Sequence, residues 1–267
     1  MIFTSSIYKI PIVKNVIVFD ETDSTNTRAK EFGKNGCVDR TLVVSDCQTS
    51  GRGRIGRSFS SPMGEGIYMS LLIKPDVESR LIPCITLLAA VAVSRALFNS
   101  LKIDTKIKWP NDILLNNKKI CGILTEKCED FIIIGTGINV NNKKFESRLK
   151  DKATSLYLET GKEYNREALI LEILKEFNAL YDTFMEKKNL KFIINEYNEK
   201  LINYDRDICL IPAELTAKIE NPYNIQSDNL PSYHCMGIAT DGSLICRDSD
   251  GKLMQINSGE ISVRNKK

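Results

Sequence analysis

The 267-residue sequence contains a single histidine, His234, and a single tryptophan, Trp109. A catalytic triad built on histidine would depend on this one side chain, and so would a metal site with several histidine ligands. We therefore expect neither kind of site. Any catalysis is expected to rest on lysine, arginine and aspartate.

The sequence also lacks cysteine patterns typical of metal sites or redox motifs. Its eight cysteines include no Cys-x-x-Cys pair and no paired metal-ligand spacing. Residues 1–15 contain no apolar run long enough for a secretory signal, because Lys9 and Pro11 interrupt them. We expect a cytoplasmic protein whose reduced thiols serve mostly as small apolar side chains.

No uninterrupted apolar run is long enough to suggest a membrane span, and no charge of one sign dominates. The longest apolar stretch, 82–101, contains Ser94, Arg95 and Asn99, which favours a buried helix over a membrane span. The 37 basic and 34 acidic residues nearly cancel, giving a net charge of +3. A dedicated nucleic-acid-binding domain would be clearly basic, so neither a nucleic-acid nor a membrane partner is expected.

Against these absences, residues 51–57 concentrate glycine and arginine in the run Gly-Arg-Gly-Arg-Ile-Gly-Arg. Glycine allows a ligand to approach the backbone closely, and arginine matches carboxylate and phosphate oxygens two at a time. The run is typical of a loop that closes over a phosphorylated ligand. From these residues alone, a solvated basic loop or a segment that touches nucleic acid remains an alternative.

Hydrophobic patterns divide the chain into a large α+β unit and a small β unit. Asn116 and Asn117 predict a hairpin turn, whereas Gly135 and Gly137 indicate close backbone approach or a bulge. From residue 208 onward, short apolar runs separated by glycine turns predict a small β-meander. We place the domains at 1–205 and 206–267, with a loop insertion at 220–232. Strands are predicted at 16–20, 41–47, 67–73, 113–115, 119–126 and 131–140, and helices at 27–32, 81–101, 165–187 and 190–201.

Five sequence blocks, in order and with matching spacing, resemble the biotin–protein ligases. They are Ser24-Thr25-Asn26; Gln48 with the glycine–arginine run; Lys108-Trp109-Pro110-Asn111-Asp112; Lys119 with Gly122-Ile123; and Gly135-Thr136-Gly137-Ile138-Asn139-Val140. The stretch 258–264 resembles the end of that family's C-terminal domain. The resemblance implies a mixed or antiparallel sheet flanked by helices, as in class II aminoacyl-tRNA synthetases, followed by a small SH3-like β-barrel.

The resemblance also implies a two-step reaction and its partners. Biotin and ATP with Mg²⁺ would give biotinoyl-adenylate, and a lysine of a biotin carboxyl carrier domain would then take the biotin. Some family members carry an N-terminal DNA-binding domain, but here some 15 residues precede the first predicted strand, so no DNA binding is expected. A monomer or a homodimer is expected.

The same resemblance assigns roles to individual residues, with no protein side chain given as a metal ligand. The expected catalytic residues are Lys119, Arg54, Asp112 and Arg52. The expected biotin contacts are Ser24, Thr25, Asn26, Gln48, Gly51, Arg52, Gly53, Arg54, Trp109, Lys119, Gly122 and Gly137. The expected ATP contacts are Arg52, Arg54, Arg57, Lys108, Trp109, Asn111, Lys119 and Asn139.

Alternatives stay open for the function and for Asp112. A lipoate– or octanoate–protein ligase shares the fold, although the glycine–arginine run and the Trp-Pro-Asn-Asp block favour biotin. An RNA-binding module or a non-catalytic ligase-like protein are further alternatives. Asp112 either assists the incoming acceptor lysine or only pairs with Lys119 or Lys108.

Overall fold

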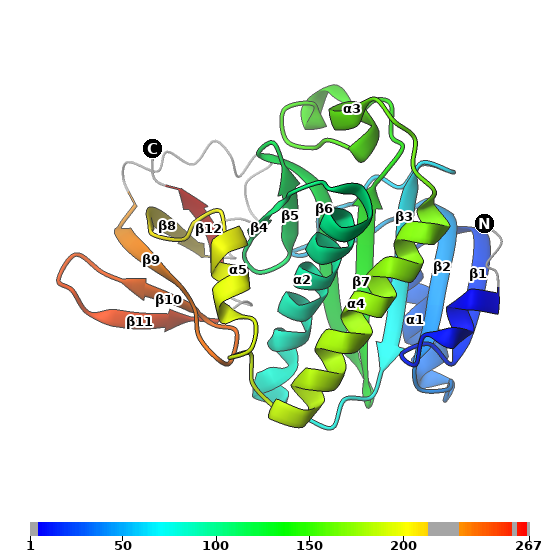
Figure 1. The fold of residues 1–267 in the computed structure, drawn as a ribbon, viewed down its shortest axis with the longest axis horizontal. Helices are drawn as coiled ribbons and strands as arrows, with labels where there is room; N and C mark the ends of the chain where they lie inside the picture. The colour runs from blue at the N-terminus through cyan, green and yellow to red at the C-terminus, as the bar shows by residue number, and fades with distance from the viewer. Residues whose placement is uncertain (1–4, 213–229, 258–260, 266–267) are drawn as a thin grey trace.

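A seven-stranded mixed sheet and a five-stranded antiparallel sheet organise the chain (Figure 1). The computed structural model describes residues 5–212, 230–257 and 261–265. The large sheet has the order β1-β2-β3-β7-β6-β5-β4; β1 and β2 are parallel and the other pairs antiparallel. Its strands are β1 (Asn15–Thr22), β2 (Thr41–Gln48), β3 (Gly66–Ile73), β4 (Lys106–Lys108), β5 (Asp112–Leu115), β6 (Lys118–Cys128) and β7 (Phe131–Asn139). This mixed sheet with flanking helices confirms the predicted fold class.

Helices cover both faces of this sheet. Helix α1 (Thr25–Lys34) packs on one face, and α2 (Ile82–Leu101) and α4 (Arg166–Lys187) pack together on the other (Figure 1). All eight residues of β3 are therefore buried. Asn165 caps α4, since its side chain accepts a hydrogen bond from the Ala168 N–H.

Helix α2 is a core helix. Within the described residues, Ser79–Leu101 is the helical segment long and apolar enough to cross a membrane, but 72% of that apolar window is buried inside the fold. Its Arg95 forms ion pairs with Glu196 at 2.6 Å and Glu176 at 3.7 Å. These contacts confirm the buried helix predicted from the sequence.

Helix α1 differs from the prediction in its length and in its first turn. The helix begins at Thr25, and Ser24 occupies the N-cap position without a capping hydrogen bond from its side chain. Asp23 instead accepts a hydrogen bond from the Ser24 N–H at 2.6 Å. Thr25 and Asn26 are buried, because the first turn faces the sheet.

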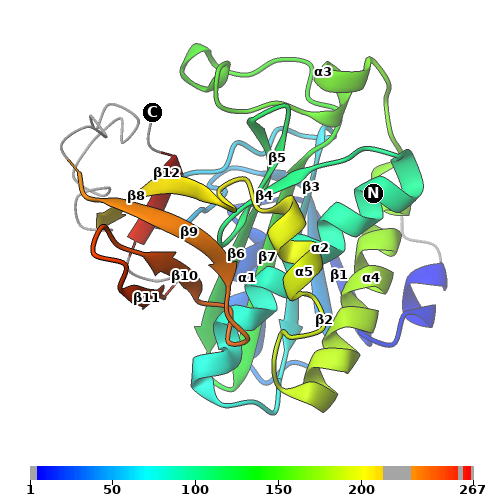
Figure 2. The same cartoon turned by 60° about the vertical axis from the view of Figure 1, so that its left-hand side comes forward.

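The second sheet has the order β11-β10-β9-β8-β12 and consists of β8 (Arg206–Pro212), β9 (Ser232–Ile238), β10 (Leu244–Arg247), β11 (Leu253–Ile256) and β12 (Ile261–Asn265). It lies beside the β4–β5 end of the large sheet (Figure 2). Strand β12, the last in the chain, pairs with β8, the first strand of this sheet in the sequence, and so extends the predicted meander. Of the insertion placed at 220–232, residues 220–229 lie outside the described residues, and β9 already begins at Ser232.

The helices between the two sheets differ from those predicted. The helix expected at 190–201 is reduced to α5 (Ile194–Lys200), and residues 190–193 form a turn in which the Ile193 N–H donates to the Leu190 carbonyl at 2.9 Å and the Leu190 N–H donates to Thr240, between β9 and β10, at 2.8 Å. The short helix α3 (Leu156–Thr160) was not predicted. Single 3₁₀ turns occur at η1 (Ser5–Lys9), η2 (Ser79–Leu81) and η3 (Ser147–Leu149).

Candidate active site

A cavity of about 140 Å³ lies at one end of the central strands. The start of α1, the end of β2, the glycine–arginine loop, the 108–112 segment and the facing parts of β6 and β7 form its walls. Most of the residues predicted for the site line this cavity: Ser24, Thr25, Asn26, Gln48, Arg52, Gly53, Arg54, Arg57, Lys108, Trp109, Asn111, Asp112, Lys119, Gly122 and Gly137. The sequence blocks therefore converge in space.

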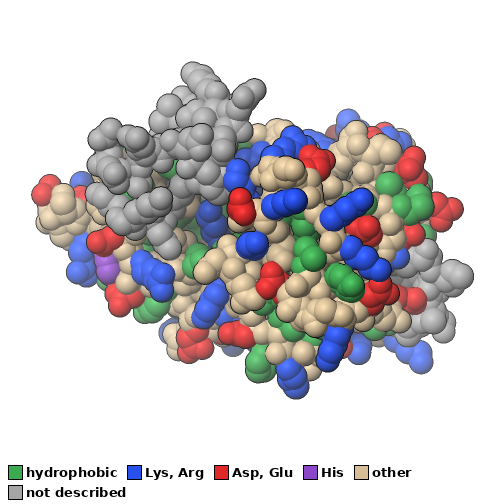
Figure 3. Space-filling view, turned by 90° about the horizontal axis from the view of Figure 1, so that it is seen from above, with side chains coloured by type: hydrophobic (Ala, Val, Ile, Leu, Met, Phe, Trp, Pro, Cys, Tyr) green, Lys and Arg blue, Asp and Glu red, His purple; other side chains and the backbone are tan. Residues whose placement is uncertain are grey.

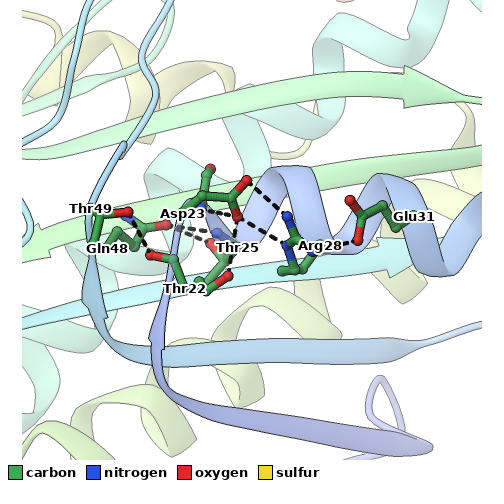
Figure 4. Close-up of polar contacts among 8 residues, drawn as sticks. Thr22, Asp23, Thr25, Arg28, Glu31, Gln48 and Thr49 are labelled. Carbon is green, nitrogen blue, oxygen red and sulfur yellow. Dashed lines mark hydrogen bonds and ion pairs between the residues drawn. The ribbon is translucent and has the colours of Figure 1, made fainter.

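One half of the cavity is a network of neutral hydrogen-bonding groups. The backbone N–H and hydroxyl of Thr25 both donate to Gln48 Oε1, at 2.8 and 3.1 Å (Figure 4). The Gln48 amide in turn donates to the Ser61 hydroxyl at 2.8 Å. The buried Ser70 hydroxyl lies 2.8 Å from Thr25 Oγ1 and 2.6 Å from Asn26 Oδ1. This wall is preorganised for a neutral polar ligand group.

Asn26 is fixed by neighbours on three sides. Its amide N–H groups donate to the Leu124 carbonyl at 3.2 Å and to Glu126 Oε2 at 2.9 Å. A Cβ atom at Gly135 would overlap the Asn26 amide oxygen. Gly135 is thus a point of close approach. The bulge considered for this strand is wrong, because β7 pairs in continuous register with both neighbours.

Lys119 brings a cationic group to the other half of the cavity. Its Nζ lies 2.6 Å from Asp112 Oδ1, an ion pair whose angle falls outside hydrogen-bond geometry. A Cβ at Gly122 would lie 2.9 Å from the same Nζ, so glycine leaves room for the ammonium. The Lys119 backbone is held between the Lys152 carbonyl, at 2.8 Å, and the Thr154 N–H, at 3.0 Å. A rigid strand therefore presents the ammonium to the cavity.

The glycine–arginine run forms a hairpin. The Phe59 N–H donates to the Gly51 carbonyl at 2.8 Å, and the Gly53 N–H donates to the Arg57 carbonyl at 2.7 Å. Its tip includes Ile55 and Gly56, both with positive φ. The hairpin brings the arginines over the cavity.

Two of these arginines contact the sheet side of the cavity. Arg52 lies 3.3 Å from Glu126 Oε1, which also pairs with Lys30 at 2.6 Å. Burial raises the pKa of Glu126, but the hydrogen bonds from Lys30 and Asn26 outweigh it and hold the pKa below its usual range. Arg54 donates to Asn111 Oδ1 at 3.0 Å, and burial lowers the pKa of its guanidinium. A ligand anion beside Arg54 would offset that desolvation.

Several cavity residues were missed from the sequence. Phe59 packs on Gly137, where a Cβ would come within 2.7 Å of its ring. Its position directly after the arginine run is a signal that it belongs to the same loop. Val263 reaches the cavity from the second sheet, and no local pattern marks it. The others missed include Ile55, Ser58, Tyr68, Pro110, Ile123, Leu124, Gly135 and Thr136.

The structure does not bring Gly51 or Asn139 to the cavity wall. Gly51 is buried at the base of the hairpin, where a Cβ would overlap the Phe59 carbonyl oxygen. Asn139 is 4% exposed, and its amide donates to the Thr154 carbonyl at 3.0 Å. Both residues therefore support their neighbours from outside the cavity.

Charge on the face of the molecule that Figure 3 shows is mixed. Lysine and arginine side chains are interspersed with acidic ones on the face shown in Figure 3. None of the eight cysteines, all within the described residues, forms a disulfide, and six are buried. The residues that the structure describes contain no group of three or more His, Cys, Asp or Glu side chains able to hold a metal ion.

Together, the mixed sheet and its cavity, half neutral and half cationic, define an α/β protein suited to binding a small molecule with an anionic end. A family model described as the biotin/lipoate A/B protein ligase family matches residues 18–139. The biotin protein ligase from Aquifex aeolicus, solved in complex with biotin and ATP, has a TM-score of 0.80 to this structure and 32% identity, and covers 95% of this chain and 100% of that chain. The chain belongs to this ligase family, in its biotin–protein ligase branch.

Relatives in sequence agree. A Bacillus subtilis protein named bifunctional ligase/repressor BirA is 44% identical over 179 residues, which are 64% of this chain and 55% of that protein. A Paracoccus denitrificans biotin–[acetyl-CoA-carboxylase] ligase is 30% identical over 176 residues, 61% of this chain and 72% of that protein. This chain thus spans only about half the length of the Bacillus relative.

Proposed function

We propose that this chain is an ATP-dependent biotin–protein ligase acting on a biotin carboxyl carrier domain. In the first step a biotin carboxylate oxygen attacks the α-phosphorus of ATP, and the bond to the β-phosphate breaks to release pyrophosphate. In the second step a neutral lysine amine of the carrier attacks the biotinoyl carbonyl carbon and expels AMP. Both steps concentrate negative charge on phosphoryl and carboxyl oxygens, which fixed cations stabilise.

One observation carries this proposal: Lys119, Arg52 and Arg54 converge on a cavity whose opposite wall is neutral and hydrogen-bonding. Lys119 would hold the biotin carboxylate and the phosphate joined to it. The hairpin arginines would clamp the phosphates, and the hairpin would shield the mixed anhydride from water. The cations are thus placed for the adenylate, and the neutral wall for the far end of biotin.

The neutral wall favours biotin over lipoate. Thr25 and Gln48 line the cavity and carry hydroxyl and amide groups that match the N–H and C=O groups of a ureido ring, and Ser70 supports them from behind the wall. The lipoate dithiolane ring has no such groups and would form no hydrogen bonds with this wall. A site built for hydrogen bonds discriminates strongly against a ligand that lacks them.

Mg²⁺ fits this site as an ion that arrives with the nucleotide. The oxygen atoms of Asn111 and Asp112 line the cavity, and Asp112 Oδ1 is buried without a hydrogen bond. Mg²⁺ usually binds substrate phosphates, a few protein oxygens and several waters. When bound, it would neutralise charge on the phosphates, and Asn111 and Asp112 would hold it. The cysteine thiols are consistent with a reducing compartment, and we place the reaction in the cytoplasm.

The test is ATP-dependent transfer of biotin to a purified carboxylase carrier domain, detected with streptavidin, with lipoate in a parallel reaction. We expect biotin transfer, reduced at least ~100-fold in Lys119→Ala because a charge-stabilising group is lost. Lys118→Ala is the matched control, since Lys118 is the neighbouring lysine and its ammonium donates to the Lys150 carbonyl. Transfer of lipoate alone, or of neither acid by the folded protein, would refute the proposal.

A further inference from the structure

The turn between β9 and β10, residues 239–243, joins the second sheet to the large one. Three successive carbonyls of this turn accept hydrogen bonds from three separate parts of the large unit. Thr240 accepts from the Leu190 N–H at 2.8 Å, and Asp241 accepts from the Cys84 thiol at 3.1 Å. The Gly242 carbonyl accepts from the indole N–H of Trp109 at 3.1 Å. A single turn thus contacts the start of α2, the segment before α5 and the cavity wall.

The turn is rigid because its own hydrogen bonds close it. Asp241 Oδ1 accepts from the Ser243 N–H at 3.0 Å and from the Ser243 hydroxyl at 2.7 Å. The backbone N–H groups of Gly242 and Ala239 donate to the carbonyls of Ala239 and Ser243, at 3.1 and 2.9 Å. These four bonds fix the direction of the Gly242 carbonyl.

Glycine is favoured at position 242 mainly by its backbone. Its φ of +84° lies in the region that other residues rarely adopt. A Cβ there would also lie 3.3 Å from Leu87, which is slightly tight, and in ordinary contact with Leu190 at 3.4 Å and Cys84 at 3.6 Å. Alanine would therefore combine backbone strain with a small displacement of the turn.

The hydrogen bond from Trp109 reaches the reacting side of the cavity. Trp109 is 2% exposed and directly precedes Pro110, Asn111 and Asp112, all of which line the cavity. Asn111 accepts the hydrogen bond from Arg54, and Asp112 pairs with Lys119. The position of the indole thus sets the backbone that carries the partners of both cations.

We propose that Gly242 is a positioning residue for the nucleotide half of the site. Its carbonyl holds the Trp109 indole, and through it the segment that presents Asn111 and Asp112. This inference rests on the proposed ligase function. It gives the second sheet a definite task, namely to keep the nucleotide wall in register with the hairpin arginines.

The effect is expected mainly in one half of the cavity. The neutral wall is built on α1, β2 and β3, through Thr25, Gln48 and Ser70. The contacts of the turn are with α2, Trp109 and Leu190. Displacement of the turn should therefore weaken the use of ATP more than the binding of biotin, which keeps its contacts with the neutral wall.

The experiment compares Gly242→Ala with Gly251→Ala in the full chain. Gly251 lies between β10 and β11 with a φ of +80°, and a Cβ there meets no atom within 4 Å. Both variants carry the same kind of backbone strain, but only Gly242→Ala moves the turn. We expect the KM for ATP to rise roughly tenfold in Gly242→Ala, because small misplacements in a site have large effects. The Kd for biotin should rise by a clearly smaller factor, because Thr25 and Gln48 of the neutral wall have no contact with the turn.

Trp109 provides a second readout that needs no ligase activity. As the only tryptophan in the chain, it accounts for all indole fluorescence. Loss of its hydrogen bond to Gly242 should shift the emission of ligand-free Gly242→Ala, whereas Gly251→Ala should match the unmodified chain. If the unmodified chain folds but has no ligase activity, the proposed function is refuted. The emission shift would still test the contact between Trp109 and Gly242.

Two results would overturn the inference. One is a folded Gly242→Ala protein with the same KM for ATP and the same emission as Gly251→Ala. The other is a result for Ser243→Ala, the variant to be used if Gly242→Ala does not fold. In that case Ser243→Ala, which removes one bond of the turn without adding bulk, is expected to raise the KM for ATP in the same direction by a smaller factor. An unchanged KM and emission in Ser243→Ala would then contradict the role of the turn.

Discussion

Ser70 is a fully buried hydroxyl whose two partners, Thr25 and Asn26, belong to the neutral wall of the cavity. Ser70→Ala would remove the group that holds the Asn26 amide oxygen. We expect a loss of about 1–3 kcal/mol in the free energy of unfolding, the usual effect of leaving a buried polar group unsatisfied. Biotin affinity should also fall, by roughly tenfold or about 1.4 kcal/mol of binding free energy, because Thr25 and Asn26 lose the hydroxyl that positions them. Calorimetric titration and urea unfolding measure the two effects.

Ser94 offers a matched control for this change. It is also fully buried, and its hydroxyl is 2.8 Å from Thr105 Oγ1 on the opposite side of the sheet from α1. Ser94→Ala should lower stability by a similar amount and leave the biotin affinity unchanged. Equal losses of biotin affinity in the two variants would show that the effect is one of general stability.

Asp112 has two possible roles that kinetics can separate. Its carboxylate lies beside Lys119 and faces the cavity. If it orients the incoming acceptor amine or accepts its proton, Asp112→Ala should slow biotin transfer more than adenylation. Pyrophosphate release reports adenylation, and single-turnover transfer from preformed adenylate reports the second step. Equal slowing of both steps would rule out a role specific to the transfer step and leave Asp112 as a partner of Lys119 or of Mg²⁺.

At the level of residues, the site residues that could be predicted from the sequence are those whose type is unusual in its local context. The alternating glycines and arginines and the Lys-Trp-Pro-Asn-Asp block are such cases. Ser70 was missed because a serine in an apolar strand carries no local signal. Its partner Thr25 is 45 positions away in the chain. Only the order of the strands, which brings β3 beneath α1, makes that contact.

At the level of elements, the glycine–arginine hairpin is held by few contacts, chiefly its backbone bonds and the contacts of Arg52 and Arg54 with the sheet side. We expect biotin plus ATP to slow tryptic cleavage within 51–59 by roughly tenfold, because segments with few contacts open at low cost and ligands that bind the closed form oppose opening. Timed digestion with mass spectrometry measures the rates. Cleavage after Arg148, which is exposed on η3, is the internal control. Equal cleavage of the hairpin with and without ligands would contradict closure.

Local sequence explains why some strands and turns were predictable. Strands such as β2 and β7 are apolar runs with β-branched residues, and such runs indicate strands whatever their neighbours are. Asn116 and Asn117 both adopt positive φ, as the predicted hairpin requires. The start of the helix predicted at 190–201 could not be predicted in this way. The helix begins at Ile194, after a turn that is held against the second sheet by the hydrogen bond from Leu190 to Thr240.

For the whole molecule, the chain's only histidine, His234, lies on β9 of the second sheet, opposite Asp207 of β8. The two ring nitrogens of His234 lie 3.0 Å from Asp205 and 3.1 Å from Asp207. Both carboxylates accept hydrogen bonds, so the arrangement is complete only when the ring carries both protons. The hydrogen bonds with Asp207 and Asp205 raise the pKa of His234 above its usual value. Arg247 lies opposite His234 in the register of the adjacent strand β10.

The raised pKa determines how stability should depend on pH. The folded chain holds the His234 proton more tightly than the unfolded chain, so this contribution is fully present below the unfolded pKa of about 6.5 and is lost as the pH rises through the folded value. Urea unfolding of the unmodified chain and of His234→Gln should therefore differ most below the unfolded pKa and converge as the pH rises through the raised pKa of the folded chain. Because the cluster is exposed, added salt should reduce the difference at low pH. A difference between the two proteins that stays constant across this range would show that His234 acts by packing alone.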